Sequence, residues 1–368
     1  MGNRNKDPRI EKLRSEGKTV WSYSRINSFN QCKLGYHLNY NKRMKNNQNI
    51  YSYMGGIIHD AIEAFQLGGF DSDGNRLNIV SDSDMVMIKE NDTSFLKKKY
   101  YEGLLESEML GLKFPNETIE KSWKDCMEDW LESFKKIDRR MVTEKLIVFE
   151  VVNGIWIQGY IDVLMGNEDG TVDIMDWKTS SKFTGKELIK AGRQLLLYEL
   201  GVEDNFKRKT SNRYWYMFKL INLCKKQKNG KIKKATFARN KWVKDNKKQF
   251  ENALRKAEID EFEIPIYINK AVADNSIECF PDDVKSQYWL EDAYVSYGSG
   301  NGKVEELKSY IKTTVETINS LDKNNDDDWD VEDIDPKKSF FCNNLCGVRE
   351  SCHKYKEYLE KYSDTFEG

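Results

Sequence analysis

Residues 159–178 read GYIDVLMGNEDGTVDIMDWK, and this segment decides the fold. Apolar and polar residues alternate through it, which predicts two β-strands. The run from Gly166 to Gly170 between them is typical of a hairpin turn, because Asp-Gly adopts positive φ angles readily. Asp162, Asp176 and Lys178 stand on these otherwise apolar strands. Two neighbouring buried carboxylates repel each other and lose hydration unless a cation lies between them, so the hairpin predicts a metal site.

The strand register decides whether the two acids can share a cation. A turn made of residues 166–170 would place Asp162 opposite Ile174. Asp176 is then the diagonal neighbour of Asp162 on the same face, within reach of a shared ion. A slip of one residue would send the acids to opposite faces, so the metal hypothesis requires an even register.

An Asp-x-Lys triplet alone is weak evidence in a chain of which 32% is charged. The simplest alternative is a surface salt bridge between Asp176 and Lys178. Against it, Val172, Ile174 and Trp177 predict a strand that is packed on both faces. This context favours a buried site over a solvated ion pair.

A helix is expected after the triplet. The run Thr184-Gly185-Lys186-Glu187 predicts a capping box at its start, and Gly201 predicts its end. Gln194 and Tyr198 are four residues apart and share one helical face. They could form the polar edge of a core helix. Beside the hairpin, we interpret them as an amide and a hydroxyl directed at the site or at a nucleic-acid phosphate.

The order of these motifs resembles the PD-(D/E)XK nucleases of the RecB type, specifically the RecB-like exonucleases with an iron–sulfur cluster (the AddB nuclease domain and the CRISPR-associated exonucleases). The resemblance implies an α/β restriction-endonuclease-like core, in which helices flank a mixed central sheet. It also implies an added helical layer and a cysteine-cluster lobe that joins the N- and C-terminal segments. The matching segments, in order, are Ser22–Ile26 with Cys32, Gly55–His59, Gly159–Asp162, Asp176–Lys178, Gln194–Tyr198 and a C-terminal cysteine cluster.

The resemblance also implies roles for individual residues. His59, Asp162 and Asp176 would bind Mg²⁺ or Mn²⁺, and the backbone carbonyl of Trp177 would add a ligand. Carboxylate oxygens suit Mg²⁺, and one imidazole shifts the preference toward Mn²⁺. Lys178 would orient the attacking water or help to deprotonate it, beside a metal that lowers the pKa of that water.

His59 and Glu144 need separate arguments. His59 follows Ile58 on an apolar helical stripe and lies at its boundary, where a lone histidine is usually structural. The motif order favours the interpretation as a ligand. Glu144 stands near a glutamate that is often found in relatives upstream of the Gly-x-x-Asp strand, and we expect at most an accessory role for it.

The cysteines indicate a second metal centre. Cys342, Cys346 and Cys352 fall within eleven residues of one another. The resemblance adds Cys32 and implies a [4Fe–4S] cluster, for which four thiolates are the expected ligands. Three residues separate Cys342 from Cys346, where relatives usually have two. A zinc site is one alternative, since four cysteines also suit zinc. The simplest alternative is that the three C-terminal cysteines are free and unrelated.

The net charge of −1 hides an uneven distribution. Residues 207–248 contain sixteen Lys or Arg and a single acid, Asp245. Asn229-Gly230 predicts a hairpin turn within this stretch. Such a hairpin fits a groove that follows a nucleic-acid strand, where lysines meet phosphates and aromatic rings stack on bases. A lysine-rich solvated surface explains it equally well. The aromatic residues concerned are Tyr214, Trp215, Tyr216, Phe218, Phe237 and Trp242.

We expect a metal-dependent DNA exonuclease that acts on single-stranded DNA or DNA ends in recombination, repair or replication. A helicase or recombinase is the expected protein partner. A structure-specific endonuclease and a non-catalytic DNA-binding scaffold are the alternatives. No apolar run is long enough to span a membrane, so we expect the cytoplasm of a bacterial or phage-infected cell. The expected divisions are a basic tail at 1–20, a cysteine-bearing segment at 21–54, the core at 55–223 with a helical layer at about 93–140, a basic hairpin and helical extension at 224–321, and an acidic linker with the cysteine cluster at 322–368.

Overall fold

The computed structural model describes residues 7–227, 229–298 and 300–362. Its centre is a seven-stranded sheet in the order β1-β3-β4-β5-β6, with β2 paired to β3 and β7 paired to β5. The β1–β3 and β4–β5 pairs are parallel and the others antiparallel. This mixed sheet, flanked by helices, is the α/β core expected from the sequence. The strands are β1 Val20–Ser22, β2 Met141–Val152, β3 Ile155–Gly166, β4 Val172–Lys178, β5 Thr210–Lys226, β6 Ile232–Ala238 and β7 Tyr288–Ser296.

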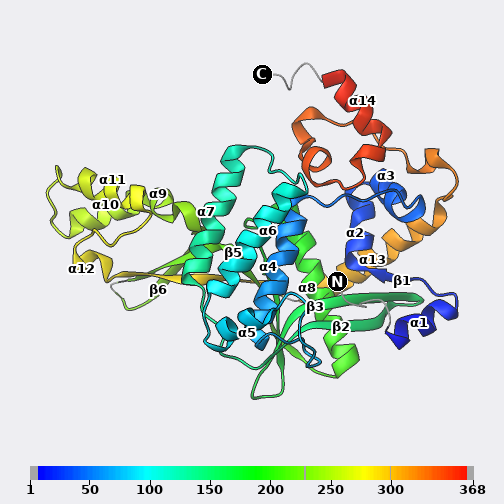
Figure 1. Cartoon of the computed structure of the whole chain (residues 1–368), viewed down its shortest axis with the longest axis horizontal. Helices are drawn as coiled ribbons and strands as arrows, with labels where there is room; N and C mark the ends of the chain where they lie inside the picture. The colour runs from blue at the N-terminus through cyan, green and yellow to red at the C-terminus, as the bar shows by residue number, and fades with distance from the viewer. Residues whose placement is uncertain (1–6, 228, 299, 363–368) are drawn as a thin grey trace.

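Helices cover both faces of the sheet (Figure 1). On one face, α8 (Gly185–Phe206) packs with α2 (Tyr23–Gln31) and α13 (Asn301–Ser320). On the other, α4 (Ile50–Leu67) packs with α6 (Ser94–Met109) and α7 (Glu117–Ser133), and only the last two fall in the helical layer that was expected at about 93–140. The remaining helical elements are α1 Pro8–Ser15, α3 Lys33–Tyr36, η1 His37–Asn41, α5 Asp82–Lys89, η2 Arg239–Lys241, α9 Trp242–Asp245, α10 Lys247–Lys256, α11 Ile264–Asp274, α12 Asp282–Lys285, η3 Asp326–Trp329, η4 Pro336–Lys338, η5 Phe341–Leu345, η6 Arg349–Ser351 and α14 His353–Tyr362.

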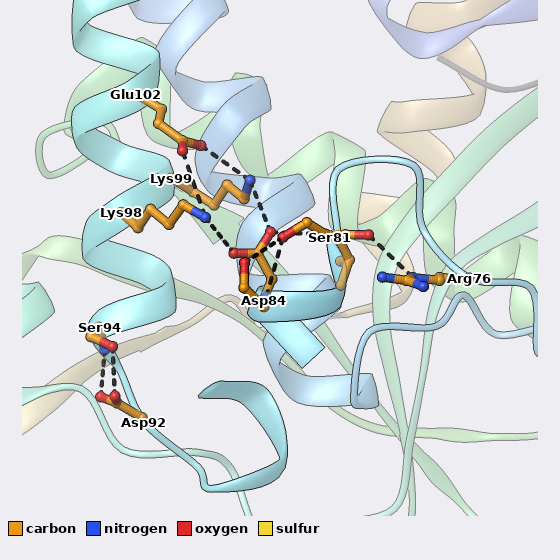
Figure 2. Close-up of polar contacts among 10 residues, drawn as sticks. Arg76, Ser81, Asp84, Asp92, Ser94, Lys98, Lys99 and Glu102 are labelled. Carbon is orange, nitrogen blue, oxygen red and sulfur yellow. Dashed lines mark hydrogen bonds and ion pairs between the residues drawn. The ribbon is translucent and has the colours of Figure 1, made fainter. Parts of the chain in front are cut away.

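A buried aspartate ties α5 to α6 in the helical layer, as Figure 2 shows. Asp84 has no exposed surface and accepts a hydrogen bond from Lys98 at 2.8 Å. Lys99 lies 3.4 Å from its other carboxylate oxygen, and the Asp84 amide is capped by Ser81. Burial acts to raise the pKa of Asp84, but the bonds from Lys98 and Ser81 hold it well below its usual range. This paired charge fixes α5 against the layer.

The ends of β5 and β7 leave the core and carry a separate lobe, at the left of Figure 1. Helices α9 to α12 enclose a hydrophobic cluster of their own there, around Phe250 and Leu254. The predicted hairpin between β5 and β6 is present, with Gly230 at φ +77°. Lys228, within the basic stretch, lies outside the described residues.

The predicted base-stacking role of the aromatic residues in the basic stretch is wrong for four of them. Trp215, Tyr216, Phe218 and Trp242 are at most 4% exposed and belong to the hydrophobic core. Several cations of the stretch pair with groups of other elements, such as Arg213 with Glu199 and Lys234 with Glu291. Fewer Lys and Arg side chains are therefore available for a basic groove than their clustering in the sequence suggested.

The β3–β4 turn begins one residue later than predicted, which changes the strand register by two residues. Leu164 lies opposite Ile174, and Gly166 opposite Val172, so the turn is Asn167–Thr171. The difference is even, and the parity of the side chains is preserved. The same register, continued by one step, puts Asp162 directly opposite Asp176, where a diagonal pair had been expected.

Helix α8 corrects two predictions made at its ends. Thr184 is its N-cap, but its side chain makes no capping hydrogen bond. The helix also runs through Gly201 to Phe206, and its C-cap Lys207 has the left-handed φ of +54°. A Cβ on Gly201 would lie 2.2 Å from Cδ1 of Ile147 on β2. Gly201 therefore permits close helix–sheet packing and does not terminate the helix.

The N-terminal segment is more ordered than a basic tail. Residues 1–6 lie outside the described residues, but α1 follows them and buries Ile10 and Leu13 against the β2 residue Val148. The expected acidic linker is also anchored, since Trp329 is fully buried and stacks on His37. Among the described residues, no helix combines the length and apolar character that a membrane span requires.

Candidate metal centre and active site

The hairpin formed by β3 and β4 holds the two predicted acids. Asp162 is 9% exposed and Asp176 only 1%. The backbone N–H of Trp177 donates a 3.0 Å hydrogen bond to Oδ2 of Asp162, which fixes that carboxylate against β4. Asp176 and Lys178 share the parity of Ile174, which packs with α8, whereas Trp177 packs with the opposite layer. The triplet is thus buried on both faces, as its sequence context predicted.

His59 reaches the hairpin from α4. Its Nδ1 lies 3.5 Å from Oδ2 of Asp162, and its ring meets that of Trp177 edge-on at 5.9 Å between centroids. Burial, together with the charge of Lys178, lowers the pKa of His59 to about 4, although Asp176 and the Trp177 backbone favour the charged form. The imidazole is therefore neutral at pH 7 and keeps a lone pair available for a metal.

Glu144, for which at most an accessory role was expected, is brought to the same place. One ligand atom each from His59, Glu144 and Asp162 lies within 4.8 Å of the other two. Asp176 is outside this group of three. In the β2–β3 register, Glu144 is the residue opposite Asp162, between the pairs Thr143–Val163 and Lys145–Ile161. Considering which residue pairs with Asp162 across the two strands could have identified Glu144 as a member of the site.

The backbone at Glu144 has an uncommon conformation. Its φ is +48°, an angle that is uncommon for a residue with a side chain and costs of order 1 kcal/mol. The neighbouring Thr143 is held firmly, because its hydroxyl donates a 2.6 Å hydrogen bond to Glu63 of α4. The strand is thus fixed beside α4 while its next residue takes the strained conformation.

Asp176 has the least satisfied carboxylate of the hairpin. Lys178 Nζ lies 2.5 Å from one of its oxygens, but within the described ranges neither oxygen, both buried, accepts a well-formed hydrogen bond. Burial raises the pKa of Asp176 to about 6; Lys178 opposes this shift and Asp162 adds to it. A buried carboxylate with spare lone pairs beside another acid fits a divalent cation, so these residues suit the predicted Mg²⁺ or Mn²⁺.

Gln194 and Tyr198 meet on the inner face of α8. Nε2 of Gln194 donates a 2.7 Å hydrogen bond to the Tyr198 hydroxyl. Burial, with the charges of Asp176 and Asp162, raises the pKa of Tyr198 well above its usual value, so the phenol stays protonated. A Cβ at Gly159 would come within 3.3 Å of the Tyr198 ring. The glycine of the Gly-x-x-Asp strand therefore lets the tyrosine approach the acids.

The four predicted cluster cysteines converge from the two ends of the chain. Cys32, at the junction of α2 and α3, packs with Cys346 and Cys352 around Leu34, Leu38 and Val348. Burial raises the pKa of Cys342 to about 11, and the nearby thiols Cys346, Cys32 and Cys352 add to the shift. The segment that carries Cys342 to Cys352 lies beside α3 in Figure 1. Four thiols in an apolar shell suit a thiolate-bound metal group.

A buried mixed sheet with acids and a lysine where two strands meet is the arrangement of an enzyme that cleaves nucleic acid with a divalent metal. The chain belongs to the PD-(D/E)XK nuclease superfamily, whose family model matches residues 20–353. No curated protein gives a significant match to the chain. The superfamily uses divalent metal ions to cleave nucleic acid, so the protein is a metal-dependent nuclease, with His59, Glu144 and Asp162 as a candidate ligand group.

Proposed function

We propose that the protein is a Mg²⁺- or Mn²⁺-dependent DNA exonuclease of the RecB-like type, acting on single-stranded DNA or DNA ends in recombination, repair or replication. The observation that carries the metal-centred mechanism is the carboxylate of Asp176, which is 1% exposed and lacks a well-formed hydrogen bond within the described chain. The depth of this group supports a substrate that can be threaded. A single strand or a frayed end can bring a phosphate to so recessed a site more easily than an intact duplex.

His59, Asp162 and Asp176 would hold the metal, with Glu144 as a further ligand and the Trp177 carbonyl as the backbone ligand. The cation would lower the pKa of the attacking water and offset charge that develops on the scissile phosphate. Lys178 would accept the proton from that water or orient it. Its ion pair with Asp176 outweighs its burial and raises its pKa, so in the metal-free protein it is a charged donor.

Gln194 and Tyr198 would act on the substrate side. The phenol is protonated and is held by the Gln194 amide, so it can donate a hydrogen bond to a phosphate oxygen. A donor fixed before the reaction stabilises charge that grows in the transition state, without reorganising at that moment.

The cysteine lobe would hold a [4Fe–4S] cluster that joins the two ends of the chain. In the described chain, no three of the thiols come within 4.8 Å of one another. A tetrahedral zinc site with Zn–S bonds of about 2.3 Å would need thiolates roughly 3.8 Å apart. The wider grouping supports a cluster over zinc.

The test compares linear and circular single-stranded DNA of the same sequence, incubated with anaerobically purified protein and Mg²⁺ or Mn²⁺. The proposal expects linear strands to be degraded progressively while circles persist. Cleavage of circles would instead identify an endonuclease. If neither substrate is cut, the protein is a DNA-binding scaffold. The Lys178→Ala variant should bind the linear strand as the wild type does and cleave it about 100-fold more slowly or worse.

A further inference from the structure

Lys219 occupies an irregular part of β5 next to the hairpin. The pairing of β5 with β7 is interrupted between Tyr216 and Ile221. On its other side, β5 runs parallel to β4, with Met217 opposite Lys178. Lys219 is therefore two residues, or about 6.6 Å of strand, beyond the level of Lys178. It stands beside the turn that leads from the Asp-x-Lys triplet into α8.

The ammonium of Lys219 lacks an acidic partner. Its Nζ donates to the hydroxyl of Ser181 over 3.5 Å, and within the described residues it forms no ion pair. Burial lowers its pKa, and Cys126 of α7 opposes that effect only weakly. A partly buried cation without a counter-ion is unfavourable in the free protein. Lys219 lies two residues beyond the level of Lys178 on the neighbouring strand, so an anionic ligand at this end of the strands would supply the missing counter-charge.

The turn beside Lys219 offers further donors. The backbone amides from Ser181 to Phe183 donate no hydrogen bond in the part of the chain that the structure describes. Ser181 is an exposed residue. Lysine ammonium, serine hydroxyl and free backbone amides are the groups that proteins use to contact phosphates of a nucleic-acid backbone. The neighbouring Lys182 is exposed and adds positive charge.

We propose that Lys219, Ser181 and the amides of the 181–183 turn bind one backbone phosphate of the substrate strand, adjacent to the phosphate that is cleaved. This inference rests on the proposed function, because it assigns a second contact to the same strand. Lys219 supplies the charge, and the hydroxyl and amides fix the position of the phosphate. The contact would set the register of the strand relative to Asp162 and Asp176. Lys219 is thus a positioning residue.

The experiment replaces single phosphates of a short single-stranded oligonucleotide by neutral methylphosphonates, one position at a time. In the wild type, one position flanking the cleaved bond should lower kcat/KM about tenfold, the size of one charge-assisted contact. In Lys219→Met, KM should rise about tenfold with kcat unchanged, and the methylphosphonate at that position should have no further effect. Lys219→Arg should restore most of the loss. Lys312→Met, which removes a lysine that is 61% exposed on α13, should behave as the wild type.

Binding measured with the Lys178→Ala background in Mg²⁺ separates this inference from the nuclease mechanism. There, Lys219→Met should weaken oligonucleotide binding about tenfold and reduce the slope of log Kd against log salt by about 0.7, the value of one contact on a single strand. Ser181→Ala, which leaves the sheet untouched, should weaken binding about threefold. The inference is overturned if Lys219→Met changes neither the oligonucleotide affinity nor the slope of log Kd against log salt. It is also overturned if the effects of the methylphosphonate and of Lys219→Met multiply at every position, because Lys219 would then contact none of the replaced phosphates. A protein that cuts nothing but shows these binding effects refutes the nuclease mechanism and keeps the phosphate site.

Discussion

Replacing Asp176 by asparagine should stabilise the metal-free protein while abolishing cleavage. The folded protein raises the pKa of this carboxyl to about 6 from an ordinary value of 3.8, chiefly through burial. A difference of about 2 pKa units corresponds to about 3 kcal/mol of unfolding free energy. Because the folded-state pKa is the higher one, the stabilising form is the protonated acid. Its contribution is complete below about pH 4 and is lost as the pH rises through 6.

Asparagine resembles the protonated acid and does not titrate. In EDTA, the Asp176→Asn variant should therefore be more stable than the wild type by about 1.5 kcal/mol at pH 5 and about 3 kcal/mol at pH 8. Urea unfolding followed by circular dichroism measures both differences. In Mg²⁺ at a thousand times its Kd the order should reverse, because the cation stabilises only the protein that binds it, by about 4.1 kcal/mol.

Asp173, on the same strand, is the matched control. It is 5% exposed, and although burial acts to raise its pKa, hydrogen bonds from Asn212, Asn167 and Arg139 lower it. Asp173→Asn should therefore destabilise the protein by about 1–3 kcal/mol at pH 8, and the deficit should shrink as the pH falls. The reasoning is refuted if Asp176→Asn is less stable than the wild type in EDTA at pH 8, or if its advantage does not grow with pH.

Three further predictions test packing, the metal and the cysteines. Gly201→Ala should lower the free energy of unfolding, because overpacking against Ile147 costs about 1–3 kcal/mol and the gain in helix propensity is only about 1 kcal/mol. Urea unfolding measures this loss, and adding Ile147→Val, which removes the clashing Cδ1, should recover part of it. Glu144→Gln should raise the Mn²⁺ concentration for half-maximal cleavage about tenfold, and an unchanged metal titration would exclude Glu144 as a ligand. Cys352→Ser should lose bound iron and visible absorbance after anaerobic purification, whereas Cys279→Ser should keep both; zinc in place of iron would refute the cluster.

The sequence predicted the hairpin site because its evidence is local. Alternation through residues 155–178 indicated two strands, and buried acids on apolar strands indicated a cation. The turn position was wrong by one residue, and the strand register therefore by two, because several residues of the Gly166–Thr171 segment can occupy a turn. The error changed a diagonal acid pair into a direct one but left the shared face intact, since side-chain parity tolerates an even shift.

Glu144 and Gly201 show what local patterns leave out. Glu144 joins the site only because β2 pairs with β3 in a register that puts it opposite Asp162. The Asn153-Gly154 turn between the two strands predicts the hairpin, but no short-range pattern predicts the irregularity between Glu150 and Val152 that shifts its register by one residue. Gly201 has the signature of a helix end, yet α8 continues through it because Ile147 leaves no room for a side chain. The aromatic residues of the basic stretch were misassigned for a similar reason. Burial of Trp215 and Tyr216 follows from sheet pairing, which local charge does not report.

Anomalous scattering from crystals soaked in Mn²⁺ would show whether the two acids of the hairpin share a cation. We expect a single strong peak within about 2.5 Å of carboxylate oxygens of both Asp162 and Asp176 and of a His59 ring nitrogen, with Lys178 displaced from Asp176. A peak at the two acids is expected to vanish in the Asp162→Asn variant. Active crystals in which the hairpin stays empty, or binds Mn²⁺ without Asp176, would contradict this expectation.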